Sequence, residues 1–113
     1  MTTDRKTVAY DLVDHLRRQE AFSQRTFGPG QRTAGVLAHI RKELIEIERA
    51  PADLSEWIDV VILAFDGANR AGYAPWQIAT ALRDKLAVNE GRTWPDWRTR
   101  SVDDPIEHVR GQE

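Results

Sequence analysis

Two acidic pairs with identical spacing stand on either side of a proline, and this pattern limits what the chain can fold into. Both pairs lie in residues 39–59, and the break between them contains Pro51. Residues three apart on an α-helix lie on neighbouring turns of one face, so each pair aims two carboxylates the same way. If the two helices pack antiparallel across the break, four carboxylates converge. They are Glu43 with Glu46, and Glu56 with Asp59.

Four converging carboxylates predict a cation, because like charges at close range cannot all stay ionised without one. The expected ligands are hard carboxylate oxygens, with no cysteine among them. Such ligands suit Mg²⁺, with Mn²⁺ as an alternative. The pattern therefore predicts a divalent metal site between two helices.

Composition narrows the class of protein. A chain of 113 residues suits one domain spanning residues 1–113. The net charge of −2 gives no basic field for nucleic acid, and no apolar run is long enough to span a membrane. The first residues lack the apolar core of a signal peptide, and the absence of cysteine fits a reducing compartment. We expect a cytoplasmic protein with neither nucleic acid nor membrane as a partner.

Hydrophobic periodicity predicts an all-α protein, a four-helix bundle followed by an extended tail. The expected helices cover residues 4–27, 34–49, 54–71 and 75–90, and the tail starts near residue 93. The third helix is apolar nearly all round, so it should be buried on several sides. The expected core includes Val8, Leu12, Leu16, Trp57, Val61, Leu82 and Leu86.

Helix ends are marked by capping residues. Thr33 and Asp53 are expected N-caps, Gly72 is the expected residue after the third helix, and Pro75 suits the first position of the fourth. Glu56 stands three residues after Asp53, which is also a capping-box spacing. Glu56 therefore has two interpretations, a metal ligand or a cap, whereas Asp59 has no structural alternative.

Several other polar residues lie beside the predicted core. Gln19 and Ser23 continue the apolar stripe of the first helix, so they either reach the surface or face a pocket. His39 stands one turn before Glu43, where a lone histidine most often has a structural or supporting role. Lys85 and Asn89 flank the core of the fourth helix and Arg92 continues their line; the alternative is solvated charge at a helix end.

The acidic pairs and their context resemble a known family. E-L-I-E followed by E-W-I-D on adjacent helices resembles the all-α NTP pyrophosphohydrolase superfamily, the MazG-like and dimeric dUTPase-like enzymes. F-S-Q-R-T-F-G-P-G, G-V-L-A-H-I-R-K-E-L-I-E-I and K-L-A-V-N-E-G-R-T-W-P look like the dATP/dGTP pyrophosphohydrolase family within it. The likeness covers roughly residues 8–110. This family is frequent in phages, so the resemblance suggests a viral source and the host cytoplasm as location.

The resemblance implies a MazG-like bundle that hydrolyses purine deoxynucleoside triphosphates to the monophosphate and pyrophosphate. It implies metal binding by both acidic pairs, with two or three Mg²⁺ ions per site. One departure is Lys42 before Glu43, where the superfamily often has two adjacent acids, and this leaves the number of metals open. The remaining residues expected in the site are Lys85, Asn89 and Arg92 at the phosphates, and Gln19, Ser23, Phe22 and more weakly His39 at the base.

The parts suggest a mechanism in which water attacks the α-phosphorus. Glu46, and with it Glu43, is the expected catalytic carboxylate that takes the proton. Lys85 and Arg92 would stabilise the charge of the leaving pyrophosphate. The family resemblance implies purine substrates, and we expect dGTP marginally ahead of dATP.

Two other functions compete with this one. A di-iron carboxylate bundle needs Glu-x-x-His motifs, which the sequence lacks. A non-catalytic nucleotide-binding or regulatory helical protein is the main alternative, in which the acids are solvated surface residues. The amount of apolar surface on four helices predicts a homodimer or homotetramer, with Trp94 and Trp97 of the tail as a cross-subunit element.

Overall fold

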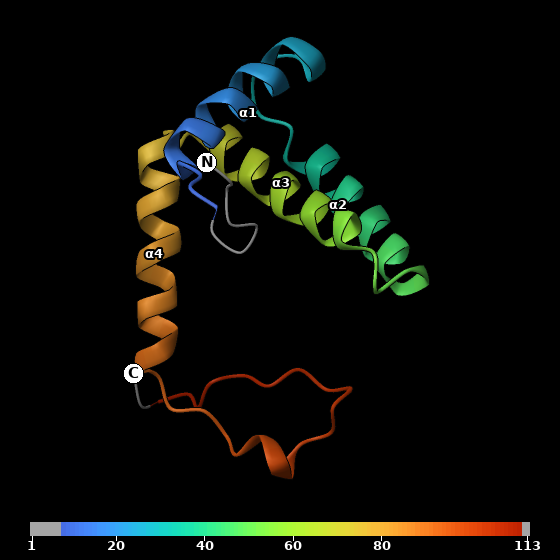
Figure 1. Cartoon of the computed structure of the whole chain (residues 1–113), viewed down its shortest axis with the longest axis vertical. Coiled ribbons are helices and arrows are strands. Elements are labelled where there is room, and N and C mark those ends of the chain that lie inside the picture. The colour runs from blue at the N-terminus through green and yellow to red at the C-terminus, as the bar shows by residue number, and fades with distance from the viewer. Residues whose placement is uncertain (1–7, 112–113) are drawn as a thin grey trace, which may run out of the picture. The chain divides into compact units, whose positions relative to one another are not determined.

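The computed structural model describes residues 8–111, and this part of the chain contains α-helices and no β-strand. The predicted all-α fold is confirmed. The elements are α1 (Leu12–Phe27), α2 (Thr33–Arg49), α3 (Leu54–Arg70), α4 (Pro75–Gly91) and the short 3₁₀-helix η1 (Trp97–Thr99), as shown in Figure 1. None of the described helices is long and apolar enough to cross a membrane. The chain divides into two compact units, Met1–Ala79 and Thr80–Glu113.

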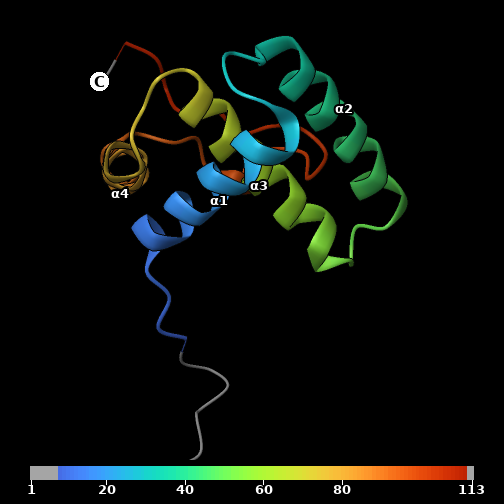
Figure 2. The ribbon, with the colours of Figure 1, turned by 90° about the horizontal axis from the view of Figure 1, so that it is seen from above.

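In the first unit, α2 and α3 form an antiparallel hairpin, and α1 packs across α3 (Figure 2). The connection at residues 50–53 is short, and the two helices that it joins lie side by side. Asp53 caps α3 as predicted, because its carboxylate accepts from the Ser55 N–H at 3.0 Å. This hairpin therefore places the second acidic pair beside the first.

The start of α1 differs from the prediction. Residues 8–11 are not helical, and Asp4 lies outside the described residues. Asp11 acts as the N-cap because its side chain accepts from the Asp14 N–H at 3.1 Å, which starts the helix at Leu12. Val8 precedes this cap and is 79% exposed, so its predicted core position was wrong.

The other helix ends agree with the prediction within one residue, with one changed cap. Thr33 was expected as the N-cap of α2, but it is the first helical residue, because the Arg32 carbonyl accepts the first helical bond from Val36. The Arg32 side chain makes no capping bond. Gly72 follows α3 with a φ of 108°, a left-handed value that suits glycine, and Pro75 opens α4.

The buried apolar core of the described chain is small. It consists of Leu16, Val36, Ile47 and Ile78. The prediction that α3 is buried on several sides was wrong for the single chain, since Trp57 and Val61 are 51% and 44% exposed. Within the first unit α2 covers one side of α3 and α1 crosses it, and its other faces stay open.

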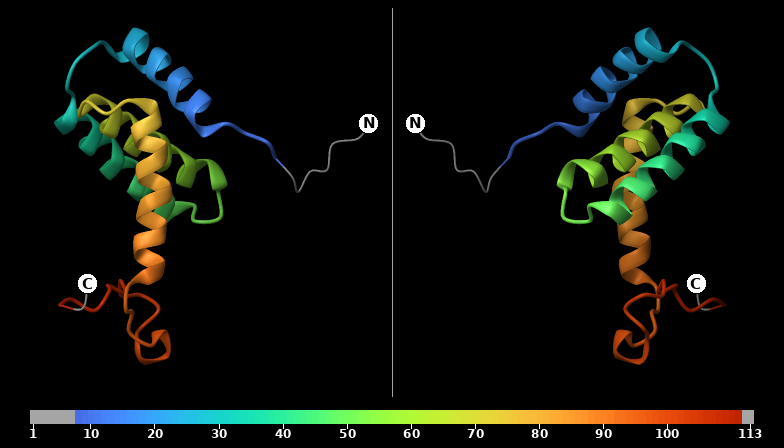
Figure 3. Two further views of the ribbon diagram at one scale, coloured as in Figure 1. Left: turned by 90° about the vertical axis from the view of Figure 1, so that its left-hand side faces the viewer. Right: turned by 90° about the vertical axis from the view of Figure 1, so that its right-hand side faces the viewer.

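The second unit contains the end of α4 and the segment that follows it. Leu82 and Leu86 were expected in the core but are exposed, because this unit has no other α-helix to cover them. The tail is irregular apart from η1 and turns back on itself (Figure 3). The Val109 N–H donates to the Thr93 carbonyl at 2.7 Å. The Trp94 indole N–H donates to the Asn89 carbonyl at 2.8 Å, which holds the tail against the end of its own helix.

Candidate metal centre

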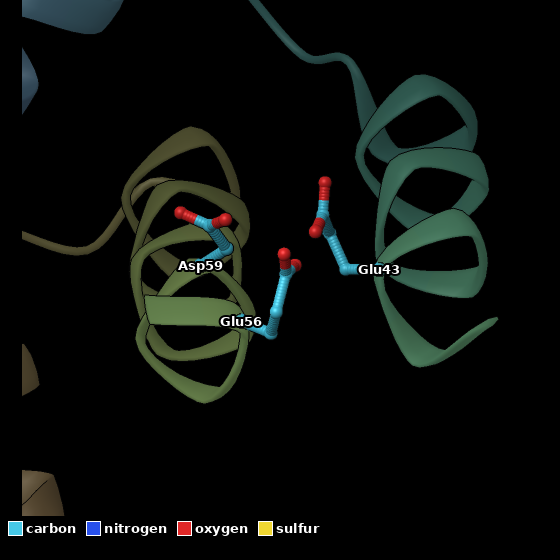
Figure 4. A group of neighbouring side chains, drawn as sticks. All are labelled: Glu43, Glu56 and Asp59. Carbon is cyan, nitrogen blue, oxygen red and sulfur yellow. The ribbon is translucent and has the colours of Figure 1, made fainter. Parts of the chain in front are cut away.

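Three carboxylates from two helices converge in the α2–α3 hairpin. Glu43 extends from α2 toward Glu56 and Asp59 of α3 (Figure 4). One oxygen from each of the three lies within 4.8 Å of the others. The antiparallel packing that the sequence predicted thus brings members of both acidic pairs to one place.

The environment of this group is unfavourable for three free charges. The Glu43 side chain is only 12% exposed, and His39 lies beside it, with 3.2 Å between His39 Nε2 and Glu43 Oε1. Partial burial of Glu56, followed by the hydrogen bond and charge of Glu43, raises the pKa of Glu56 above its ordinary value of 4.5. A divalent cation would remove this repulsion, and the all-oxygen donor set fits Mg²⁺ or Mn²⁺.

Glu46 is not a member of this group of three. It remains close enough that its negative charge also raises the pKa of Glu56. Glu46 therefore lies near the three carboxylates without joining them.

The alternative role of Glu56 as a helix cap is not realised. The Asp53 N–H, which a capping box would direct to the Glu56 side chain, donates instead to the Ala50 carbonyl at 3.0 Å. The carboxylate of Glu56 is directed toward Glu43 (Figure 4). This geometry favours the ligand interpretation of Glu56.

A cavity of about 270 Å³ adjoins the carboxylates. It begins at Glu43 and Asp59 and follows α2 and α3 away from the connection at residues 50–53 to aromatic residues of α1. The residues that line it are Phe22, Phe27, Arg32, Gly35, Val36, His39, Glu43, Asp59, Ile62, Leu63 and Asp66. Within the described part of the chain, the cavity thus has two carboxylates at one end, an apolar middle, and Arg32 with Asp66 at the other end.

The side chains of Ser23 and Gln19 both form hydrogen bonds with other residues of the protein. Ser23 is 3% exposed; its hydroxyl donates to Asp66 Oδ1 at 2.6 Å and accepts from Arg70 Nη2 at 2.8 Å. Gln19 donates to the Ile62 carbonyl at 2.7 Å and bonds the His15 ring at 2.9 Å. Neither lines the cavity beside the carboxylates, although Gln19 lines a second cavity, of about 490 Å³, which Phe22 also lines.

Arg32, Phe27 and Gly35 were not singled out from the sequence, yet they line the cavity. A signal for Arg32 was present, because it precedes His39 by seven residues and so continues the stripe of His39 and Glu43 toward the start of α2. Phe27 and Phe22 pack edge to face at 5.9 Å between ring centroids, which forms the aromatic wall of the cavity.

The predicted phosphate-binding residues all belong to the second unit. Arg92 Nη1 donates to Asn89 Oδ1 at 3.0 Å, and Arg92 Nε is buried without a hydrogen-bond partner in the described chain. Lys85 is exposed on α4. Their participation in the site stays a prediction.

Comparisons with known proteins agree on the family. The model of the dATP/dGTP pyrophosphohydrolase family matches residues 15–112. A dATP/dGTP diphosphohydrolase of Salmonella phage PMBT28 is 39% identical over 84 residues, which cover 74% of this chain but only 28% of that protein. A dATP/dGTP diphosphohydrolase of Cyanophage S-2L is 33% identical over 104 residues, covering 89% of this chain and 91% of that one.

A solved structure has the same fold. It is the Cyanophage S-2L MazG-like pyrophosphohydrolase bound to dGDP and three catalytic Mn²⁺ ions per active site. The TM-score is 0.70 at 27% sequence identity, and the match covers 93% of this chain and 98% of that one. The family model and the cyanophage relative each match most of the chain, so the protein belongs to the dATP/dGTP pyrophosphohydrolases, a family of hydrolases with a MazG-like all-α fold.

Proposed function

We propose that this protein hydrolyses dGTP and dATP to the nucleoside monophosphate and pyrophosphate, in a reaction that requires Mg²⁺ or Mn²⁺. One observation carries the proposal: three carboxylates converge beside a cavity in a chain of this family. The related cyanophage structure holds dGDP and three Mn²⁺ ions, which supports a purine nucleotide and two or three ions per site here.

Glu43, Glu56 and Asp59 would hold the metal ions, with Glu46 as a further ligand or as the base. When bound, divalent ions neutralise phosphate charge and lower the pKa of coordinated water. His39 restrains the Glu43 carboxylate through the contact at 3.2 Å, and so fixes its direction toward α3.

The carboxylate of Glu46 accepts a proton from the water that attacks the α-phosphorus, assisted by Glu43. Attack at this position breaks the bond to the β-phosphate, so the products are the monophosphate and pyrophosphate. Lys85 and Arg92 bind the leaving pyrophosphate and stabilise its charge. Asn89 orients Arg92 through their hydrogen bond of 3.0 Å.

We also propose that the protein works as a homodimer or homotetramer in the cytoplasm of a phage-infected host. Exposed apolar side chains on the hairpin support an assembly, since a monomer rarely leaves so many uncovered. They include Leu37 and Leu44 of α2, and Leu54, Ile58 and Val61 of α3. The phage origin of both relatives supports the location.

Separate incubation with each dNTP and NTP in the presence of Mg²⁺, followed by chromatography, tests this function. We expect turnover of dGTP and dATP, with pyrophosphate rather than phosphate released. Asp59→Asn should abolish turnover, whereas Glu48→Gln on the exposed part of α2 should not. Preferred turnover of dUTP or dCTP would contradict the purine assignment, and turnover of no nucleotide would favour the non-catalytic binding protein.

A further inference from the structure

Among residues 8–111, Arg32 is the one arginine or lysine that lines the cavity beside the carboxylates. Its guanidinium makes one hydrogen bond within residues 8–111, from Nη1 to the Phe27 carbonyl. The remaining N–H groups of Arg32 are thus free to meet a ligand. Asp66, the other charged residue at this end, is already bonded to Ser23 and Arg70.

We propose that Arg32 reads the base of the substrate and favours guanine over adenine; this assignment rests on the proposed function. Arginine carries donors and no acceptor. Guanine offers two adjacent acceptors, O6 and N7, which a guanidinium contacts together, whereas adenine replaces O6 with an amino donor. The donors of Arg32 therefore match the two acceptors of guanine. In adenine one of them would face the amino group, which is itself a donor.

The position of Arg32 along α2 assigns it to the base rather than to the phosphates. Arg32 precedes Glu43 by about three helical turns, or roughly 16 Å along the axis. A nucleotide whose α-phosphate lies at the carboxylates extends its base along the cavity, toward the end that holds Arg32. The half-exposed rings of Phe22 and Phe27 stand at this end and offer an apolar surface on which a purine stacks.

Gly35 keeps space open at the same end of the cavity. A Cβ atom built on Gly35 would meet one atom within 4 Å, the Nη2 of Arg32 at 3.8 Å. Gly35→Ala should therefore fold normally, and it removes a helix-interior glycine, which favours stability. Its added methyl group lies beside the guanidinium, so it should weaken purine binding without harming the fold.

Calorimetric titration with dGMP, dAMP and inorganic pyrophosphate, each with Mg²⁺, separates base reading from phosphate binding and from catalysis. The wild-type protein should bind dGMP more tightly than dAMP. Arg32→Gln should lower the ratio of the two affinities by roughly fivefold to a hundredfold, because a glutamine amide matches adenine better than guanine. Pyrophosphate binding, which involves no base, should not change.

Two matched controls accompany these variants. Arg41→Gln makes the same change on the exposed surface of α2, outside the cavity, and should preserve the dGMP to dAMP ratio. Gly91→Ala makes the glycine change at the end of α4, where the new Cβ would meet no atom within 4 Å, and should also preserve it. Circular dichroism and thermal unfolding of every variant establish that each is folded.

The outcomes distinguish this proposal from the enzymatic one. An unchanged ratio of dGMP to dAMP affinity in a folded Arg32→Gln protein would overturn the proposed base recognition. An equal loss of dGMP and pyrophosphate binding would also overturn it, because it would place Arg32 at the phosphates. Wild-type protein that binds neither monophosphate would overturn it as well. If the protein binds dGMP selectively but hydrolyses no dNTP, the role of Arg32 in base recognition would be supported and the proposed hydrolysis would be contradicted.

Discussion

The Ser23 hydroxyl of α1 donates a hydrogen bond to the Asp66 carboxylate of α3 across 2.6 Å. Arg70 extends this hydrogen-bond network, because it donates to Ser23 and to Asp66. Its Nη1 also donates to the Gly30 carbonyl at 2.8 Å. The Arg70 side chain is 2% exposed, so its charge is matched almost entirely within the protein. This network fastens α1 and the turn at residues 28–30 to α3, and Asp66 from it forms part of the cavity wall.

Ser23→Ala should destabilise the protein by about 1–3 kcal/mol, because Arg70 and Asp66 both lose a buried partner. Chemical denaturation measures the change in free energy of unfolding. Thr26→Ala removes a hydroxyl from the exposed face of the same helix and should change it by less than about 0.5 kcal/mol. Equal effects of the two substitutions would contradict a structural role for the Ser23 hydroxyl.

Mg²⁺ or Mn²⁺ should raise the unfolding temperature, because a ligand that binds only the folded state stabilises it by mass action. The gain is about 2.7 kcal/mol at a metal concentration 100 times the dissociation constant. Differential scanning calorimetry with and without a chelator measures it. Asp59→Asn should remove most of the gain, and Glu48→Gln, which changes a carboxylate of α2 outside the cluster, should retain it. An unfolding temperature that is the same with and without the chelator would contradict the proposed metal centre.

Glu56→Gln distinguishes a metal ligand from a helix cap by activity and stability together. The amide preserves the size of the side chain and removes its charge. If Glu56 binds metal, the variant stays folded and loses most dNTP turnover. A capping residue would show the opposite pattern, retained turnover with a loss of about 1 kcal/mol or less in stability. Turnover near the wild-type rate in Glu56→Gln would exclude Glu56 from the centre.

The metal-free protein should lose stability as the pH rises from about 4.5 through the raised pKa of Glu56. In this window the folded state holds a proton that the unfolded state has released, so by linkage the free energy of unfolding falls with pH. Thermal unfolding in a chelating buffer follows this slope. Glu56→Gln should flatten it and Glu48→Gln should not. Stability that rises with pH through the window, and rises equally in Glu56→Gln, would contradict the assignment.

The protein should be a homodimer or homotetramer at micromolar concentration, as measured by light scattering. Leu54, Ile58 and Val61 are spaced by four and three residues, so they form an exposed apolar stripe on α3. Val61→Glu should lower the measured mass by placing a charge in that stripe. Arg41→Glu introduces the same side chain on a polar surface and should leave the mass unchanged. A monomeric wild-type protein would contradict the assembly.

Much of the fold followed from local signals in the sequence. Pro51, Gly72 and Pro75 act through their own backbone, and Asp53 acts through a side chain that accepts from the backbone two residues on. The helix ends near them were therefore predictable within one residue. The start of α1 was not predictable in this way. The apolar periodicity extends back to Val8, whereas the Asp11 cap starts the helix only at Leu12. A competing cap overrides periodicity where both are present.

The convergence of three of the four acidic residues in the candidate site was predictable for a similar reason. Glu43, Glu56 and Asp59 come from two helices joined by a short connection, so their convergence follows from helical phase and antiparallel packing. The hydrogen bonds of Ser23 could not be predicted from the sequence, because its partners Asp66 and Arg70 lie more than forty positions away along the chain. Burial of α3 was overestimated because apolar periodicity does not tell whether the same chain or another copy provides the cover.

The short connection between α2 and α3 also has a consequence for folding. All three carboxylates belong to one helical hairpin, Thr33–Arg70, so bringing them together closes only a short loop and costs little chain entropy. Proteins rich in such local contacts fold faster than those dominated by contacts between distant residues. A metal ion at these carboxylates would therefore require the folded hairpin but no contact from α1.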